Sequence, residues 1–263
     1  MIFLNTTQQK GISLETRTLM EYKVVKRNDL IQRSRYQLST QEQKIILYLI
    51  SKIKPDDDEL KLYEFKIKDF CEVCGMDERS GKNYVTLKNT IKNLTDKSVW
   101  ITLDDGRETV ARWIERPYID RKSGTIQIKL DEFMKPYLLE LQKHFTVYNL
   151  YFTLGMKSKY SLRIYEILKS FQNMGQCEFE IERLKDILFA EKYARYQDFR
   201  VKVLEVALRE INDYSDISVK YELKKQGRKF DKIKFSIHLK TDLDQRMETF
   251  KKIEKRIDRT NRG

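Results

Sequence analysis

Phe65-Lys-Ile67-Lys-Asp-Phe70 and, about 115 residues further along, Phe179-Glu-Ile181-Glu-Arg-Leu184 share the pattern that decides the fold. Each segment predicts a short alternating strand that runs directly into a helix. An amphipathic helix precedes each strand, over Gln41–Ile53 in the first copy and Ser158–Phe171 in the second. The sequence therefore predicts the same order of helix, strand and helix twice.

A longer helix and then a hairpin follow in each copy. The apolar stripes of the two long helices have the same spacing, at Leu87, Ile91 and Leu94 and at Leu204, Leu208 and Ile211. Alternating β-branched runs then flank a turn at Gly106 and another at Gly227, which predicts two hairpins: Val99–Leu103 with Thr109–Ile114, and Ile217–Tyr221 with Ile233–Ile237. This order is that of a winged helix, so we expect an α+β fold of two tandem winged-helix domains related by an internal pseudo-repeat. The alternative is an ordinary α+β domain in which the two segments are similar by chance.

The domain boundaries follow from this repeat. We expect an N-terminal winged helix over residues 22–144, a C-terminal one over 145–240 and a basic amphipathic tail over 241–263. Residues 145–154 are apolar and aromatic and lack flexible linker composition, so the two domains should touch. The partner of the tail is not apparent from the sequence, and a frayed, solvated helix is an equal alternative.

The chain is strongly basic. It has 52 Lys and Arg against 40 Asp and Glu in 263 residues, a net charge of +12, which favours nucleic acid as the partner. It has no apolar run long enough for a membrane span and no secretory signal, so we expect no membrane partner and a cytoplasmic bacterial location, associated with the nucleoid or a plasmid. The three cysteines are too few for a disulfide framework and lack the partners of a zinc site, so we expect small core thiols.

The second long helix has a polar face that is not needed for packing in the core. Its buried face should comprise Phe199, Val203, Leu204, Ala207, Leu208 and Ile211. In the major groove, arginine forms hydrogen bonds with guanine and glutamine with adenine. Clustered cations at the hairpin turn are suited to phosphate contact, and a solvated hairpin tip is the alternative. We expect the DNA-binding residues of this domain to be Arg195, Tyr196, Gln197, Arg200 and Lys202 with Lys192 before them; Lys224, Lys225, Arg228 and Lys229 in the wing; and Lys157, Lys159, Tyr160 and Arg163 in the opening helix.

The first copy is less suited to DNA. Its expected wing tip is Asp104-Asp105-Gly106-Arg107, which would repel phosphate. Residues 151–240 carry 19 basic and 13 acidic residues, against 26 and 22 in residues 1–150. We therefore expect the second domain to be the main DNA reader. The first domain keeps Lys82, Asn83 and Lys88 for weaker DNA contact, and its spare surfaces are candidates for self-association.

An ordered set of motifs over about residues 22–240 resembles the iteron-binding initiator proteins of theta-replicating plasmids. The set is Asn28-Asp-Leu30, Leu38-Ser-x-x-Glu42-Gln-Lys44, Ser158-Lys-Tyr160-Ser-Leu-Arg163, Phe199-Arg200 through Asn212, and Lys225-Gln-Gly227-Arg228-Lys229. The resemblance implies binding of repeated duplex DNA at an origin, with Lys159, Arg163, Arg200 and the basic wing at matching binding positions. It also implies a monomer in equilibrium with a homodimer, origin opening and recruitment of the host initiator and replicative helicase by monomers, and autorepression by dimers.

Catalytic alternatives lack their residues. Rolling-circle initiators need closely spaced histidines to hold a metal, whereas His144 and His238 are far apart in the sequence. The segment Gly75–Asn83 departs from a phosphate-binding loop, and Asp56–Asp58 has the composition of a solvated turn. We therefore expect a protein that is not an enzyme, with no catalytic residues, metal or cofactor. The chief rival function is a winged-helix transcriptional regulator, and a smaller one is a chromosomal or phage partner protein.

Overall fold

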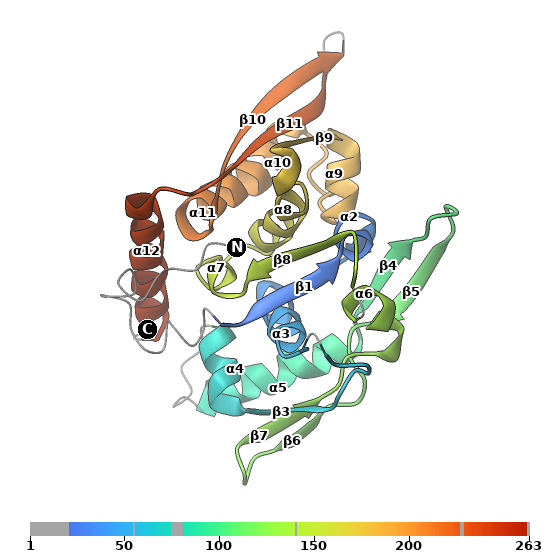
Figure 1. Ribbon diagram of the computed structural model, residues 1–263, viewed down its shortest axis with the longest axis vertical. Coiled ribbons are helices and arrows are strands. Elements are labelled where there is room, and N and C mark those ends of the chain that lie inside the picture. The colour runs from blue at the N-terminus through green and yellow to red at the C-terminus, as the bar shows by residue number, and fades with distance from the viewer. Residues whose placement is uncertain (1–20, 55, 75–80, 140, 227–228, 262–263) are drawn as a thin grey trace.

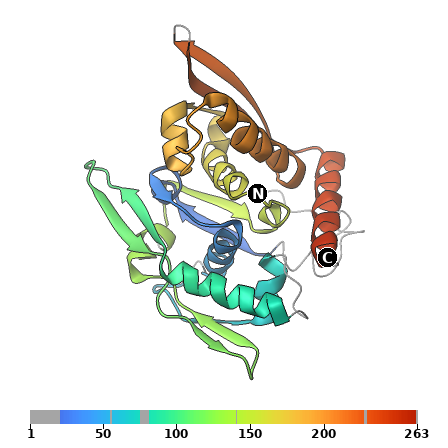
Figure 2. The same ribbon diagram turned by 180° about the vertical axis from the view of Figure 1, so that it is seen from behind.

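The computed structural model describes residues 21–54, 56–74, 81–139, 141–226 and 229–261 (Figure 1). Two lobes lie on either side of a two-stranded sheet, and three β-hairpins project from them in different directions (Figures 1 and 2). None of the described helices contains an apolar stretch that would cross a bilayer.

The C-terminal lobe is the winged helix that the sequence predicts. Its three strands pair in the order β10-β11-β9, with β10 and β11 forming a long antiparallel hairpin. Its elements are α8 (Lys159–Ser170), β9 (Gln176–Glu180), α9 (Ile181–Ile187), α10 (Tyr196–Phe199), a π-helical turn (Arg200–Leu204), α11 (Glu205–Tyr214), β10 (Ile217–Gln226) and β11 (Lys229–Leu239). A short 3-10 helix, Gln172–Met174, connects α8 to β9.

The N-terminal lobe repeats this topology, which confirms the tandem arrangement. The strand before its short helix, β3, pairs with β7, and β7 pairs with β6, so the order β3-β7-β6 matches β9-β11-β10. Its elements are α3 (Thr40–Ile50), β3 (Tyr63–Lys66), α4 (Ile67–Cys74), α5 (Gly81–Thr95), β6 (Tyr118–Asp120) and β7 (Thr125–Ile128). A capping box explains where α3 begins, because the Ser39 hydroxyl accepts from the Glu42 N–H while the Glu42 carboxylate accepts from the Ser39 N–H.

The first wing is therefore not where the sequence placed it. The expected hairpin forms as β4 (Ser98–Thr102) and β5 (Glu108–Arg112), but it pairs with β2 (Ser34–Tyr36) in a separate sheet. The hairpin that corresponds to β10–β11 is β6–β7, whose turn contains Arg121 and Lys122 and closes at Gly124 with φ +69. Local alternation predicts that a hairpin forms and not which distant strand it joins, so the acidic tip at Asp104-Asp105 was wrongly assigned to the wing.

Two further elements hold the lobes together. Strand β1 (Lys23–Arg27), at the start of the described chain, pairs antiparallel with β8 (Phe145–Asn149), so the segment between the copies is a strand, and the domains touch as expected. The helix α2 (Asn28–Gln32) follows β1, while a 3-10 helix (Glu132–Met134) and α6 (Lys135–Leu138) precede β8. Because β8 pairs with a strand of the first copy, the division at 144/145 stays a prediction.

The tail forms helix α12 (Leu243–Asn261), which is docked on the second lobe. Its Phe250 and Ile253 are buried, and the Phe250 ring stacks on the ring of Phe152, a residue of α7 (Tyr151–Leu154). Lys252 pairs with Asp213 of α11 at 2.9 Å. These contacts supply the partner that the sequence did not reveal.

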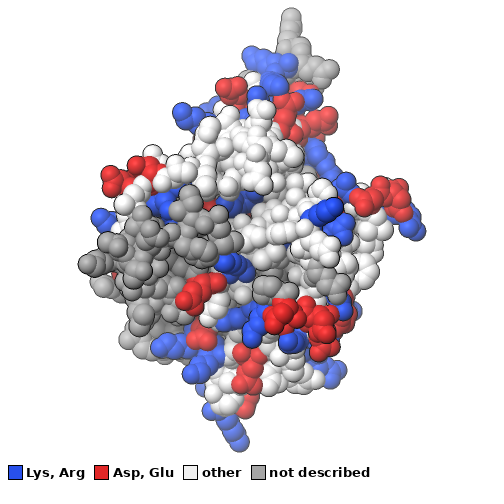
Figure 3. All heavy atoms as spheres, viewed as in Figure 1, with Lys and Arg blue, Asp and Glu red and all other residues white. Residues whose placement is uncertain are grey.

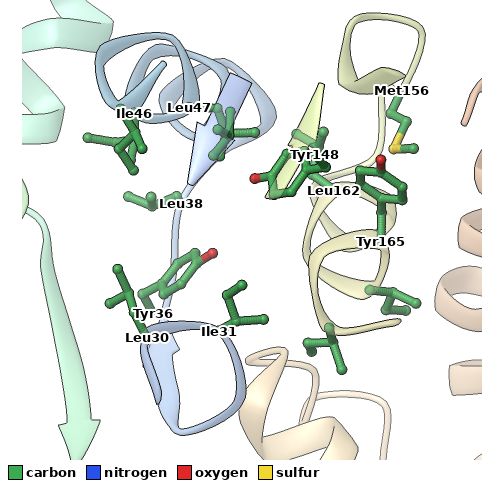
Figure 4. Packing of buried hydrophobic residues seen from close by; sticks show 14 of the residues in the cluster. Leu30, Ile31, Tyr36, Leu38, Ile46, Leu47, Tyr148, Met156, Leu162 and Tyr165 are labelled. Carbon is green, nitrogen blue, oxygen red and sulfur yellow. The ribbon is translucent and has the colours of Figure 1, made fainter. Parts of the chain in front are cut away.

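A buried polar network joins the lobes at α8. The Lys26 ammonium of β1 lies 2.5 Å from a carboxylate oxygen of Glu166, which also accepts from the hydroxyl groups of Tyr148 and Tyr36. Figure 4 shows Tyr36 and Tyr148 in the packed layer between α2, α3, β8 and α8. Burial alone would raise the pKa of Glu166, but the positive charges of Lys26 and Arg163 and the hydrogen bonds hold it below its ordinary value. The carboxylate is therefore ionised inside the protein.

Replacing Glu166 by Gln should destabilise the protein strongly. The substitution leaves the Lys26 ammonium buried without its anion, a loss that costs about 3–5 kcal/mol when one partner of a buried pair is removed. Urea unfolding, monitored by circular dichroism, would measure the change in the free energy of unfolding. The control is Glu132→Gln, which removes one of the two carboxylates paired with Lys129, the other being Glu115, and should cost about 1 kcal/mol or less because Glu132 is exposed. Equal shifts of the two midpoints would contradict the role of Glu166.

Candidate DNA-binding interface

The long helix of the second lobe presents the face that the sequence predicts. Phe199, Val203, Leu204, Ala207, Leu208 and Ile211 are all buried. Arg195, Gln197 and Lys202 are exposed at or near the start of the helix, and the Arg200 side chain is 40% exposed. These outward side chains combine charge for phosphate with the hydrogen-bonding groups that recognise bases.

A π-helical turn at Arg200–Leu204 creates this orientation. Arg200 precedes Val203, Leu204 and Ala207 by three, four and seven residues, so a regular α-helix would turn it toward the core. Instead the Glu205 N–H donates to the Arg200 carbonyl, five residues earlier, and the extra residue in the turn places Phe199 inside. Such π-turns occur frequently at functional sites.

The cations of this helix are paired with acids of the same helix. Arg200 lies 2.7 Å from Glu205, while Arg195 and Lys202 lie 3.1 and 3.2 Å from Asp198. The hydrogen bonds from Lys202 and Arg195 lower the pKa of Asp198, so its carboxylate is charged at neutral pH. These pairs are exposed and weak, so a phosphate or a guanine edge would replace them at little cost.

The β10–β11 hairpin adjoins the start of the same helix. Burial, together with the nearby Tyr221 of β10, raises the pKa of Tyr196 to about 12. Lys224 and Lys225 are exposed toward the tip, and Figure 3 shows basic and acidic side chains interspersed along the hairpin. Glu178 of β9 pairs with Lys224 and Lys232, an acidic neighbour that the linear sequence does not reveal. Arg228 and the Lys229 side chain lie outside the described residues.

The opening helix α8 is largely unavailable to DNA, contrary to the sequence-based expectation. Arg163 is only 4% exposed, donates to the backbone oxygen of Ser34 at 2.8 Å and lies over the Tyr36 ring. Tyr160 is also buried, against the Tyr193 ring. Placing either side chain on the accessible surface was wrong: Ser34 and Tyr36 of the first lobe cover Arg163, and Tyr193 of the second lobe packs on Tyr160.

Lysines from both lobes gather near the N-terminal end of α8. Burial first, and then the positive charges of Lys192 and Lys97, lower the pKa of Lys159. Lys192 is exposed, as is Lys157 just before the helix. Like charges this close favour an anion between them. Lys97, which follows α5 of the first lobe, was missed because its proximity depends on how the lobes dock.

The first lobe presents cations on α5 and on the turn of β6–β7. Lys88 is exposed on α5; Lys82 and Asn83 lie in the same helix, but their side chains are outside the described residues. Arg121 and Lys122 are exposed, and the Arg121 guanidinium lies 5.4 Å from the centre of the Tyr84 ring near the start of α5. The basic turn and the helix therefore adjoin each other, as in the second lobe.

Two findings concern metal ligands and cysteines among the described residues. Within the described ranges, no three His, Cys, Asp or Glu side chains are grouped so that they could hold a metal. Cys71 and Cys177 are buried, and burial raises the pKa of the Cys177 thiol to about 12, so this thiol is protonated and unreactive at neutral pH.

Comparison with known proteins matches both lobes to one family. Residues 23–169 match the family described as "Initiator Replication protein, WH1", and residues 180–237 match "Initiator Rep protein, WH2". A "Replication initiation protein" of Escherichia coli is 26% identical in an alignment of 238 residues that covers 86% of this chain and 72% of the relative. A crystal structure of domains 2 and 3 of RctB aligns with a TM-score of 0.47 and 10% identity, over 77% of this chain and 81% of that one.

Replacing Arg200 by Ala should weaken specific DNA binding more than replacing Lys92, an exposed lysine of α5, by Ala. Loss of one bidentate base contact costs roughly 1–3 kcal/mol, or about 5- to 150-fold in affinity, whereas loss of a single phosphate contact weakens all sequences alike. Fluorescence anisotropy with specific and scrambled duplexes would measure both effects. Equal losses in the two variants would contradict the second lobe as the main reader.

Proposed function

The chain belongs to the initiator replication protein family, and from this premise we propose that it starts plasmid replication by binding repeated duplex DNA at an origin. The second lobe reads the sequence through α10 and the π-turn, and the β10–β11 hairpin grips phosphates. The protein acts in the cytoplasm, where plasmid DNA is found, and performs no catalytic step of its own.

One observation carries this proposal. The outward side chains of Arg195, Gln197, Arg200 and Lys202 lie on a helix that adjoins a basic hairpin, which is the arrangement by which winged helices bind duplex DNA. The net charge of +12 adds a sequence-independent attraction to DNA. The lysine group at Lys97, Lys159 and Lys192 extends the basic surface toward the first lobe.

The first lobe makes a secondary DNA contact and also provides the dimerisation surface. With α5 and β6–β7 arranged as α11 and β10–β11 are in the second lobe, two recognition helices engage successive major-groove faces about one helical turn, or roughly 10 bp, apart. Origin repeats near 20 bp follow from that spacing. Monomers open the origin and recruit the host initiator and replicative helicase, and dimers repress the promoter of their own gene.

A plasmid that carries the origin repeats should depend on this protein for its maintenance. Footprinting on DNA that flanks the coding region should reveal the repeats and their spacing. A plasmid bearing that DNA and an in-frame deletion of the gene should then be lost, and should be retained when the protein is supplied from a second replicon. Normal replication without the protein would contradict the initiator function and would favour a transcriptional regulator that binds the same DNA.

The two wings should contribute separately to the salt dependence of binding. Each phosphate contact that is lost makes the plot of log affinity against log salt concentration shallower by about 0.9 between about 50 and 200 mM salt. We expect shallower slopes for Lys224→Ala/Lys225→Ala and, with a smaller loss of affinity, for Arg121→Ala/Lys122→Ala. The matched control is Lys251→Ala/Lys255→Ala on the exposed side of α12. An unchanged slope for Lys224→Ala/Lys225→Ala would contradict the contact between β10–β11 and phosphate.

A further inference from the structure

Val201 is an apolar side chain on the outward face of the recognition helix. It lies within the π-turn between Arg200 and Lys202 and is 45% exposed, whereas Val203, two residues later, is fully buried. The position gains little from valine as such, because valine is β-branched and has a lower helix propensity than alanine. A single exposed valine needs no explanation in general, but here it stands among the side chains that face the DNA.

We propose that Val201 reads the methyl group of a thymine in the major groove. This inference rests on the proposed function and adds to it a specificity-determining residue and the base that it recognises. In the major groove an A·T pair presents the N7 and N6 groups of adenine and, beside them, the C5-methyl group of thymine. The thymine methyl is the apolar feature of that edge, and it makes favourable contact with an apolar side chain.

The spacing along the helix supports an A·T step. Gln197 precedes Val201 by four residues, and both side chains are exposed, so the two lie about one turn apart on the same face. A glutamine amide forms a bidentate contact with adenine N6 and N7. Gln197 and Val201 together therefore match the polar and the apolar groups of A·T pairs.

The π-turn gives a second, independent reason. The extra residue that turns Phe199 inward and Arg200 outward belongs to the same turn that carries Val201, and this turn is the segment that the proposed function places in the groove. Arg200 and Lys202 flank Val201 in the sequence, and both are exchangeable cations, because their ion pairs with Glu205 and Asp198 are exposed. A partner that is anionic overall and has an apolar group within a groove fits this surface, and duplex DNA containing thymine is such a partner.

The test compares thymine with uracil, which lacks only the C5-methyl group. The probe is the specific duplex defined by footprinting, with thymines replaced one at a time by deoxyuridine. Wild-type protein should lose about fourfold in affinity at one position of each repeat, the effect expected from burying one methyl group. Val201→Ala should bind the thymine duplex about as weakly as wild type binds the uracil duplex, and should not distinguish the two duplexes.

Controls separate this contact from other effects. Val201→Thr keeps one methyl group and should retain part of the discrimination, whereas Val110→Ala, at a valine with similar exposure on β5, should leave it intact. The salt dependence of Val201→Ala should equal that of wild type, because no phosphate contact is removed. Circular dichroism checks that Val201→Ala folds, as is expected because alanine favours the helix.

The outcomes distinguish the inference from the function on which it rests. If wild type binds no duplex sequence-specifically, the proposed function itself fails. If it binds a specific duplex but uracil has no effect at any position, Val201 contacts no methyl group and the inference is overturned. The inference is also overturned if Val201→Ala remains as sensitive to uracil as wild type, because another residue then reads the methyl group.

Discussion

The ionised Glu166 carboxylate, buried between the two lobes, is the constraint on which the arrangement of this protein depends. A charge in the interior is tolerated only when it is paired and hydrogen-bonded, and the partners here come from separate parts of the chain: Lys26 of β1, Tyr36 of β2 and Tyr148 of β8. Separating the lobes would leave the Glu166 carboxylate without these partners. Because Glu166 lies on α8, the opening helix of the second winged helix, this pair ties the second lobe to β1 and β8 at the junction of the lobes.

The same principle applies at the candidate DNA-binding interface, with the opposite energetic result. The cations of the recognition helix are also paired with carboxylates, but these pairs are exposed and contribute little to stability. Asp198 pairs with Arg195 and Lys202, and Glu205 pairs with Arg200, but these exposed pairs can exchange for other anionic partners. The buried Lys26–Glu166 pair thus stabilises the junction of the lobes, whereas the exposed pairs leave the cations of the candidate interface able to change partners.

Much of the fold could be predicted from the sequence, because the signals are local. The stripe at Leu204, Leu208 and Ile211 and the capping sequence at Ser39 and Glu42 specify helices through residues a few positions apart. The wing of the first lobe could not be predicted, because β3 and β7 pair over a long separation and alternation specifies no partner. Arg163 was placed at the surface for a related reason: its own helix leaves it outward, and only the docking of the first lobe buries it.

The burial of Arg163 changes how the candidate interface should be understood. An arginine at a position that resembles a family binding residue here donates to Ser34 of the other lobe, so its charge contributes to the junction instead of to phosphate contact. Lys159, four residues earlier, is only partly buried and lies near Lys97 and Lys192. One end of α8 therefore faces the basic surface while its middle faces the junction. The same helix carries the lysine group at its N-terminal end and the Glu166 network in its middle, so the docking of the two lobes that buries Glu166 also brings Lys97 of the first lobe near Lys159.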